Sequence, residues 1–255
     1  MQYSLKVLYS CSTGNAAVLT AGKTAVLIDA GRSARALTDA LNSAGIDPDA
    51  LSAVFLTHEH RDHTAALDVF LKKHPLPVHV TQASADRMLK TASEALRAAL
   101  VPHPPVSTVT VGDLTFCSFP TPHDSAASVG YRITVGTHTI GYATDLGTVT
   151  PAVEAGLMGC EAVVLECNHD EQMLLTGPYP RELKRRICAR NGHLSNTDCA
   201  RFAARLAACG MRRLLLAHLS ETNNLPELAL GEVRAALAGT SVHIRAAAPD
   251  AVVEL

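Results

Sequence analysis

The amino-acid sequence predicts an α+β fold in which two β-sheets pack face to face and helices cover their outer sides, a four-layer αββα arrangement. Short apolar runs separated by tight turns dominate the start of the chain, and a strand-rich stretch followed by a more helical stretch occurs twice. No repeat of fixed period and no low-complexity linker divides the chain. We therefore expect one domain over residues 1–255, which is long enough to bury a large core.

The first half of the chain carries strand signals followed by helix signals. Turn sequences at 12–15 and 21–23 separate the first apolar runs. Ser33 is a candidate cap for the first helix and Gly45 a candidate end for it. Prolines 102, 104 and 105 predict a connection after the last helix of this half. The expected elements are strands at 5–9, 16–19 and 25–28, a helix from 33 to 45, a strand at 53–56, and helices at 64–73 and 83–100.

The second half repeats the order with longer strands. Gly210 is placed to end a helix, and short apolar runs close the chain. The expected elements are strands at 106–111, 114–119, 128–135, 138–143 and 162–166, a helix at 196–209, a strand at 213–217, a helix at 226–238, and strands near 241–246 and 251–254.

Composition excludes several classes of protein. Apolar residues make up 47% of the chain and charged residues 18%, as in ordinary globular proteins, and a net charge of −2 provides no global basic field. The seven cysteines include no C-x-x-C pair, which argues against a disulfide framework and a cysteine-based zinc site. The start of the chain resembles a strand rather than a signal peptide, and no apolar stretch suits a membrane span. We expect a cytoplasmic protein with reduced thiols and no membrane partner.

The segment Thr57-His58-Glu59-His60-Arg61-Asp62-His63 is the most informative part of the sequence. It follows an apolar run that predicts a buried strand, and imidazole and carboxylate groups are ligands that zinc, manganese and iron accept. His58 and His60 are two residues apart, so both can leave the same side of an extended backbone. The side chains of Asp62 and His63 can then turn toward a second position close to the first. One metal ion cannot easily use all four side chains, whereas two adjacent ions can.

Three more candidate ligands follow predicted strands far along the chain. They are His123, Asp145 and His218. Side chains at strand ends along one sheet edge converge in space. A single histidine after a strand is more often an ordinary surface or core residue, so the joint pattern carries the argument.

The order H-x-H-x-D-H, then His, Asp and His, resembles the metallo-β-lactamase fold superfamily along essentially the whole chain. The resemblance implies the αββα metallo-β-lactamase sandwich. It also implies two divalent metal ions, the first held by His58, His60 and His123, the second by Asp62, His63 and His218, with Asp145 bridging both. The donor set suits Zn²⁺ or Mn²⁺, and Fe²⁺ also accepts it.

Two further segments are similar to the phosphodiesterase branch that contains ribonuclease Z. They are Gly192-His193-Leu194-Ser195 and Leu165-Glu166-Cys167-Asn168-His169-Asp170. The resemblance implies that His193 is the general acid for the leaving oxygen and that Glu166 is its partner. Without the family pattern, a plain turn before a helix, capped by Ser195 or Asn196, is the favoured interpretation of the first segment. His169 is open between a supporting role, a substrate contact and an ordinary surface residue.

Within that branch the chain resembles the YycJ/WalJ-like group of small exonuclease-like metallohydrolases. The supporting segments are residues 10–15, 27–31, 57–63, 142–145, 166–170 and 192–196. Cys11 stands where the group usually has glycine, which bears on the loop that carries Ser12 and Asn15. Only 72 residues separate Asp145 from His218, and no Gly/Pro-rich arm follows Asp145, so a tRNA-maturation role is disfavoured.

The segment 181–190 holds five positive charges in ten residues and leads directly to His193. A solvated helix face explains it as well as a contact with a phosphate backbone does. The candidate substrate contacts are Ser12, Asn15, His169, Arg185 and Ser195. The expected partner is nucleic acid, with DNA favoured over RNA.

The leading hypothesis is a dinuclear-metal hydrolase, most specifically a phosphodiesterase and DNA exonuclease that uses a metal-bridging hydroxide. Asp145 would place that hydroxide, Asp62 would accept a proton, and His193 with Glu166 would protonate the leaving group. The 5′-to-3′ polarity follows from the resemblance alone. A hydrolase of a small ester, thioester or lactone could use the same metal centre, and a catalytically silent metal-binding regulatory protein is the third alternative.

Overall fold

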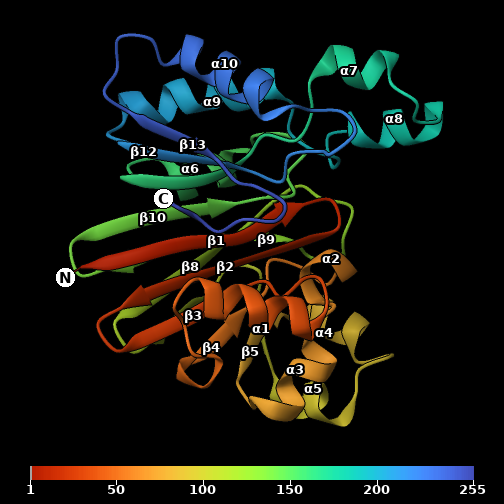
Figure 1. Cartoon of the computed structure of the whole chain (residues 1–255), viewed down its shortest axis with the longest axis vertical. Helices are drawn as coiled ribbons and strands as arrows, with labels where there is room; N and C mark the ends of the chain where they lie inside the picture. Colours follow the sequence, from red (N-terminus) through yellow and green to blue (C-terminus); the bar gives the residue numbers. More distant parts are fainter. Residues whose placement is uncertain (1) are drawn as a thin grey trace.

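A computed structural model describes residues 2–255 and contains two seven-stranded sheets packed against each other (Figure 1). The first sheet consists, in spatial order, of β14 (Val253–Glu254), β1 (Tyr3–Cys11), β2 (Gly14–Ala21), β3 (Thr24–Ile28), β4 (Ala53–Phe55), β5 (Val78–Thr81) and β6 (Leu100–His103). The second consists of β13 (His243–Ala246), β12 (Arg213–Ala217), β11 (Ala162–Glu166), β10 (His138–Ala143), β9 (Val129–Val135), β8 (Leu114–Pro120) and β7 (Thr108–Val111).

Each sheet is antiparallel in one part and parallel in the other. Strands β1, β2 and β3 pair antiparallel, and β3 to β6 pair in parallel. The second sheet follows the same plan, with β7 to β10 antiparallel and β10 to β13 parallel. Parallel strands end at the same edge of a sheet, so the residues that follow β4, β10, β11 and β12 are delivered to one side of the molecule.

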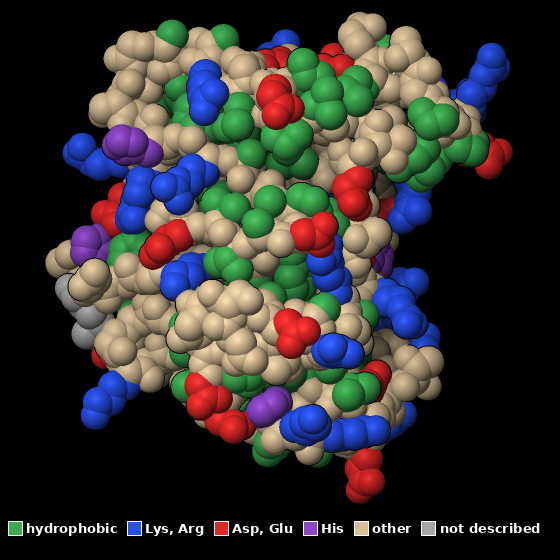
Figure 2. All heavy atoms as spheres, viewed as in Figure 1, with side chains coloured by type: hydrophobic (Ala, Val, Ile, Leu, Met, Phe, Trp, Pro, Cys, Tyr) green, Lys and Arg blue, Asp and Glu red, His purple; other side chains and the backbone are tan. Residues whose placement is uncertain are grey.

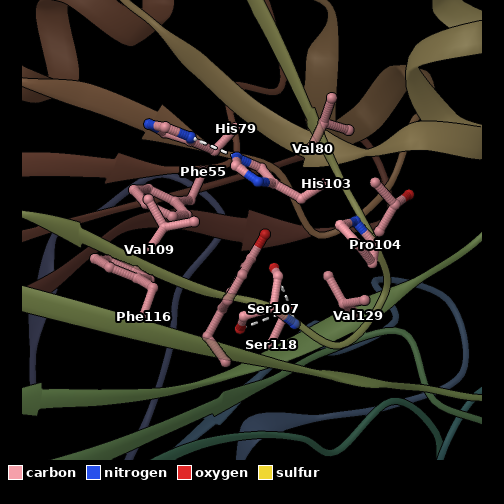
Figure 3. A pocket seen from close by; sticks show the side chains of 12 residues that line it. Phe55, His79, Val80, His103, Pro104, Ser107, Val109, Phe116, Ser118 and Val129 are labelled. Atoms are coloured by element: carbon pink, nitrogen blue, oxygen red, sulfur yellow. Dashed lines mark hydrogen bonds between the residues drawn. The ribbon is translucent and has the colours of Figure 1, made fainter.

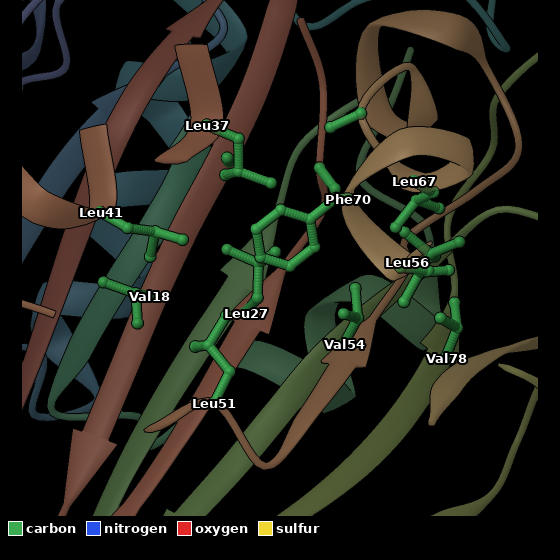
Figure 4. Packing of buried hydrophobic residues seen from close by; sticks show 14 of the residues in the cluster. Val18, Leu27, Leu37, Leu41, Leu51, Val54, Leu56, Leu67, Phe70 and Val78 are labelled. Carbon is green, nitrogen blue, oxygen red and sulfur yellow. The ribbon is translucent and has the colours of Figure 1, made fainter. Parts of the chain in front are cut away.

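Three apolar layers hold the sheets and helices together. The cluster between the sheets includes Phe55, Phe116 and Tyr131, and the rings of Phe55 and Phe116 stack with centroids 3.9 Å apart. A second cluster joins the outer face of the first sheet to its helices, where Leu27 and Val54 face Leu37, Leu41 and Phe70 (Figure 4). A third cluster does the same for the other sheet. Both faces of each sheet are therefore buried, which confirms the predicted four-layer arrangement.

Helices lie on the outer face of each sheet. Ser33 caps the first one, because its Oγ accepts a hydrogen bond from the backbone N–H of Ala36 at 3.2 Å. The helices are α1 (Ala34–Ser43), the short 3₁₀ helix Pro48–Ala50, α2 (Arg61–Thr64), α3 (Leu67–Lys73), α4 (Gln82–Met88), α5 (Glu94–Ala99), α6 (Pro151–Leu157), α7 (Glu171–Thr176), α8 (Arg181–Ile187), α9 (Asn196–Ala208) and α10 (Pro226–Ala236).

The structure corrects the prediction of one helix over 83–100. The segment forms two helices, α4 and α5, because Ser93 starts a new helix by accepting a hydrogen bond from Leu96 N at 3.3 Å. The backbone N–H of Ser93 in turn donates to Asp68 Oδ1 at 2.8 Å, so a tertiary contact fixes the break. The helix expected at 64–73 is likewise divided between α2 and α3.

Two strands of the first sheet were not predicted. β5 is only four residues long, and β6 contains Pro102 in the segment assigned to a connection. β6 lies at the edge of the sheet, where a missing N–H costs no ladder hydrogen bond when that group faces outward. The remaining predicted strands and helices agree with the structure to within a few residues.

All seven cysteines are free thiols, and four of them are buried. This confirms the absence of a disulfide framework. Within residues 2–255, no helix combines the length and apolar character needed to cross a bilayer.

Candidate metal centre

The candidate site lies where several strands end and the chain turns sharply. Asp29, Asp145 and His218 each follow the last residue of a strand or lie two residues beyond it, and each has a positive φ of 56–59°. That conformation is unfavourable for a residue with a side chain, least so for aspartate, and it recurs at functional sites. The turns point these side chains toward the loop and short helix that carry residues 58–63.

Three imidazoles form the first group of potential ligands. The ligand atoms of His58, His60 and His123 all lie within 4.8 Å of one another. His60 Nδ1 and His123 Nε2 are 3.3 Å apart, so these two nitrogens cannot both face each other with a proton. At this separation one nitrogen donates a proton to the other unless a cation lies between them.

Asp62, His63 and His218 form the second group, again with ligand atoms within 4.8 Å. His63 Nε2 is 3.2 Å from Asp62 Oδ2, and His218 Nε2 is 3.8 Å from the same oxygen. The structure thus brings together the residues that the resemblance assigned to each metal ion.

Asp145 lies between the two groups and offers one oxygen to each. Its Oδ2 is 3.3 Å from His63 Nε2, and its Oδ1 is 3.7 Å from His123 Nε2. The side chain is buried, with 2% exposed. This is the placement that a bridging carboxylate requires.

Unpartnered buried atoms test whether the site suits a cation. His58 Nε2, His218 Nε2 and Asp145 Oδ2 are buried without a hydrogen-bond partner. Such atoms are costly in a folded protein unless another group satisfies them. They belong to the two groups and to the carboxylate between them, so the residues present fit a divalent metal ion.

The electrostatics of the site point the same way. Burial lowers the pKa of His58 well below its usual value, so it is neutral, the form in which imidazole binds a metal. Burial alone would lower the pKa of His63 and His218 too, but Asp145 and neighbouring carboxylates raise both well above the usual value. The site therefore attracts positive charge, and a proton supplies it when a metal does not.

Buried groups behind the cluster orient its imidazoles. The carboxylate of Asp29 is fully buried, accepts hydrogen bonds from Thr57 N and Thr57 Oγ1, and lies 2.9 Å from His63 Nδ1. Thr57 Oγ1 is also 3.0 Å from His58 Nδ1. A carboxylate behind a ligating histidine fixes the ring orientation and its tautomer. Asp29 was not among the residues predicted from the sequence, although it follows a buried strand much as Asp145 does.

Glu166 is the last residue of β11 and is completely buried. Its Oε1 lies 2.8 Å from both His193 Nδ1 and His218 Nδ1, and its Oε2 accepts the backbone N–H groups of Leu146 and Leu194. Burial opposes the charge, but these partners lower the pKa of Glu166 to about 2. One carboxylate thus connects a metal-ligand candidate to the predicted general acid.

His193 reaches this position because the backbone approaches very closely at Gly192. A Cβ on Gly192 would lie 2.1 Å from the carbonyl oxygen of Ile187, so no side chain fits. The next N–H, that of His193, donates to the same carbonyl at 2.9 Å. The end of α8 therefore places His193, whose side chain keeps 23% of its surface exposed.

The other predicted substrate contacts take different places. Ser12 lines a pocket beside His193. Asn15 is buried behind the cluster, with Nδ2 3.4 Å from Asp62 Oδ2 and 3.2 Å from His63 Nε2. Ser195 caps α9, as expected if the segment 192–195 is a turn before a helix. His169 is buried with Nδ1 unpartnered.

Arg185 lies exposed on α8, while the next residue, Arg186, lines the pocket and donates from Nε to Asp124 Oδ2 at 2.5 Å. Cys11 is buried, and its sulfur contacts Thr13 and Arg32 rather than the ligand cluster.

Comparisons with known proteins agree with this geometry. A family model described as "Beta-lactamase superfamily domain" matches residues 24–219. Exodeoxyribonuclease YycJ of Bacillus anthracis is 32% identical over 229 residues, which cover 90% of this chain and 87% of that protein. Exodeoxyribonuclease WalJ of Streptococcus pneumoniae serotype 2 (strain D39 / NCTC 7466) is 31% identical over 229 residues, with 89% and 85% covered. The metallo-β-lactamase fold protein YhfI from Bacillus subtilis has a TM-score of 0.78 at 20% identity, covering 99% of this chain and 100% of that chain, and this likeness concerns the fold alone.

Proposed function

The chain belongs to the beta-lactamase superfamily and is a hydrolase of the metallo-β-lactamase fold, and from that premise we propose that it is a dinuclear metal-dependent DNA exonuclease. The observation that carries the proposal is the pair formed by Glu166 and His193, 2.8 Å apart and next to the ligand cluster. A nucleic-acid sugar oxygen is a poor leaving group that needs a proton, and a buried carboxylate that holds an imidazole is suited to supply one. Thioesters and activated esters release anions that need no proton, so their hydrolysis does not require this pair.

The proposal places one metal ion among His58, His60 and His123, a second among Asp62, His63 and His218, and Asp145 between them. Two bound divalent ions would supply a hydroxide nucleophile at neutral pH and offset negative charge on the phosphoryl oxygens. Nitrogen and oxygen donors without a thiolate suit Zn²⁺ and Mn²⁺, and Fe²⁺ as well.

Within this site His193 is the acid and Glu166 its support. Nδ1 of His193 faces Glu166, so Nε2 is the nitrogen left to donate a proton to the leaving oxygen. Because the pKa of Glu166 is lowered to about 2, it stays ionised and stabilises the protonated imidazole. Burial would raise the pKa of Asp62, but His63 and His218 lower it strongly, so Asp62 is better suited to orient water than to store a proton.

DNA is the proposed substrate because the relatives that cover most of this chain carry the name exodeoxyribonuclease. The 5′-to-3′ direction follows from the resemblance to their group. Acidic and basic side chains are interspersed on the face of residues 2–255 seen in Figure 2, which agrees with a net charge of −2. Phosphate contacts would therefore come from arginines near the site rather than from a continuous basic surface. Seven free thiols support a reducing compartment, and we place the protein in the cytoplasm.

The proposal is tested by adding Mn²⁺ or Zn²⁺ separately to metal-stripped protein and following DNA labelled at one end or the other. We expect stepwise shortening that starts at the 5′ end and is absent from the His60→Ala variant. The bound metal is counted by mass spectrometry in both proteins. Turnover of a thioester or lactone without cleavage of DNA, in protein that holds two metal ions, would contradict the proposal.

A further inference from the structure

A pocket of about 180 Å³ opens beside His193, on the side where α8 and the loop before it lie. One wall is apolar and consists of Tyr179, Leu183 and Ile187. The lining also includes the polar residues Ser12, Asn168 and Ser220 and the ion-paired side chains of Asp124 and Arg186. A pocket lined by an aromatic ring and aliphatic side chains together with hydroxyl and amide groups suits a nucleoside.

The apolar wall is held in place by its own contacts. Tyr179 lies between Pro178 and Pro180, which restrict the backbone on both sides. Lys184 Nζ donates to the carbonyl oxygens of Leu175 and Gly177 at 2.7 and 2.8 Å, so the segment that carries Tyr179 is tied to α8. The pocket is thus preformed rather than assembled by a loose loop.

A second groove lies on the other side of the ligand cluster. It has a volume of about 400 Å³, and its lining includes His60, Arg61, Thr64, Arg87 and Thr91. His123 lies between the pocket and the groove. Its ring centroid is 5.2 Å from that of His193, which lines the pocket, and 5.1 Å from that of His60, which lines the groove. Figure 1 shows α7 and α8 on the side of the second sheet's helices and α2 and α4 on the other. A DNA strand that crosses the metal-ligand cluster would run from the pocket into the groove.

The position of His193 decides which part of the substrate occupies the pocket. Its Nδ1 is held by Glu166, so the proton for the leaving oxygen comes from Nε2, in the wall of the pocket. The nucleotide that departs with the leaving oxygen must therefore lie in the pocket. The nucleotide that keeps the phosphate lies toward the arginines of the groove.

We propose that this pocket binds the 5′-terminal nucleoside of the DNA, with its base against Tyr179, an inference that rests on the proposed exonuclease function. Hydroxide forms a bond to phosphorus, the P–O3′ bond breaks, and His193 Nε2 gives its proton to O3′. The terminal nucleotide leaves with a free 3′-hydroxyl, and the phosphate remains on the 5′ carbon of the second nucleotide. Every phosphodiester has an O3′, so the acid alone sets no polarity. A pocket that holds a single nucleotide on the O3′ side admits only the first phosphodiester from a 5′ end, which accounts for 5′-to-3′ polarity.

The test compares single-stranded DNA of one sequence with an intact end, an abasic site at the 5′-terminal nucleotide, or an abasic site at the 3′-terminal nucleotide. We expect the 5′ abasic site to lower kcat/KM of the first cleavage roughly tenfold to a hundredfold, as loss of one base–aromatic stack does. The 3′ abasic site should have no effect. The released product should be a 5′-mononucleotide when the DNA carries a 5′-phosphate.

Tyr179→Ala should lose the discrimination between intact and 5′ abasic DNA, whereas Tyr179→Phe should keep it. Leu175→Ala is the matched surface control, because Leu175 is 62% exposed on α7 and does not line the pocket. Fluorescence anisotropy of the same DNAs in EDTA measures binding without turnover and should show the same loss. Leu175→Ala should hydrolyse bis(4-nitrophenyl) phosphate as wild type does, which shows that the metal centre of the control is intact.

The outcomes separate the two proposals. Equal discrimination by Tyr179→Ala and wild type, sensitivity to the 3′ abasic site alone, or release of 3′-mononucleotides would overturn the pocket assignment and leave the exonuclease proposal standing. Failure to cleave DNA of any kind, with bis(4-nitrophenyl) phosphate still hydrolysed, would instead remove the exonuclease proposal.

Discussion

Two groups of histidines in this protein have opposite surroundings. The metal centre gathers five histidines around Asp62 and Asp145 at one edge of the sheets. His79 and His103 form a pair on β5 and β6, with Nδ1 and Nε2 2.9 Å apart and stacked rings, beside Phe55, Val109 and Phe116 (Figure 3). No residue lining the small cavity at that pair carries a carboxylate.

The surroundings of the two histidine groups favour different protonation states. Carboxylates raise the pKa of His63 and His218 despite their burial, whereas burial and His103 lower the pKa of His79 to about 4. Histidines alone therefore do not make a metal site. The carboxylates that attract a cation, and the buried groups that orient the rings, separate the metal centre from a neutral structural pair.

Removing the carboxylate between the two ligand groups is the strongest test of whether carboxylates distinguish the metal centre from the His79–His103 pair. Asp145→Asn should abolish DNA cleavage, roughly a 10⁴-fold loss or about 5 kcal/mol of transition-state stabilisation. Asparagine tolerates the positive φ of 56° at this position, so the backbone can be retained. Metal content should fall from two ions toward one or none. A variant that keeps two ions and wild-type turnover would show that Asp145 does not bridge them.

Replacing His193 should separate proton donation from metal binding. His193→Ala should lower kcat on DNA about a hundredfold to a thousandfold while the metal content stays unchanged. Bis(4-nitrophenyl) phosphate releases a stable anion that needs no proton, so its hydrolysis should change little. An equal loss on both substrates would place His193 outside the acid role. Glu166 is the less selective target, since it also holds His218.

The groups behind the ligands offer a matched test, because a buried Asp–His pair at the ligand cluster can be compared with a pair at the surface. Asp29 lies 2.9 Å from His63 Nδ1 with both side chains completely buried, whereas Asp49 pairs with His74 at the surface. Asp29→Asn should weaken metal binding about 10-fold to 100-fold in a chelator competition. Asp49→Asn should leave the affinity unchanged. Equal affinities in both variants would show that the carboxylate of Asp29 does not support His63.

Much of the fold and the candidate ligand set could be predicted because the signals are local. Residues 58–63 are adjacent in sequence, and His123, Asp145 and His218 each follow an apolar run that marks a strand. What could not be predicted depends on tertiary contacts. The break between α4 and α5 rests on Asp68, 25 residues before Ser93, and β6 is a strand only because β5 lies beside it.

The pocket beside His193 could not be predicted from the sequence either. Tyr179, Leu183 and Ile187 belong to no motif, and only the folded chain brings them together beside His193. Glu166 was assigned one partner from the resemblance, whereas the structure gives it two imidazoles and two backbone N–H groups. Such connections join residues far apart in the chain, where spacing and periodicity carry no information.

The smallest predicted effect is at the His79–His103 pair, where pH should act on stability. The folded-state pKa of His79 is about 4, below the 6.5 of an unperturbed histidine, because burial and His103 disfavour its charge. The unfolded chain therefore binds more protons between these values, and the free energy of unfolding decreases as the pH falls from 6.5 to 4. His79→Gln cannot titrate, so its Tm should decline less than that of wild type over this range. The exposed His243→Gln is the control and should follow wild type. Measuring both in EDTA removes the contribution of bound metal, and identical Tm profiles for all three proteins would show that His79 is as freely protonated as a surface histidine.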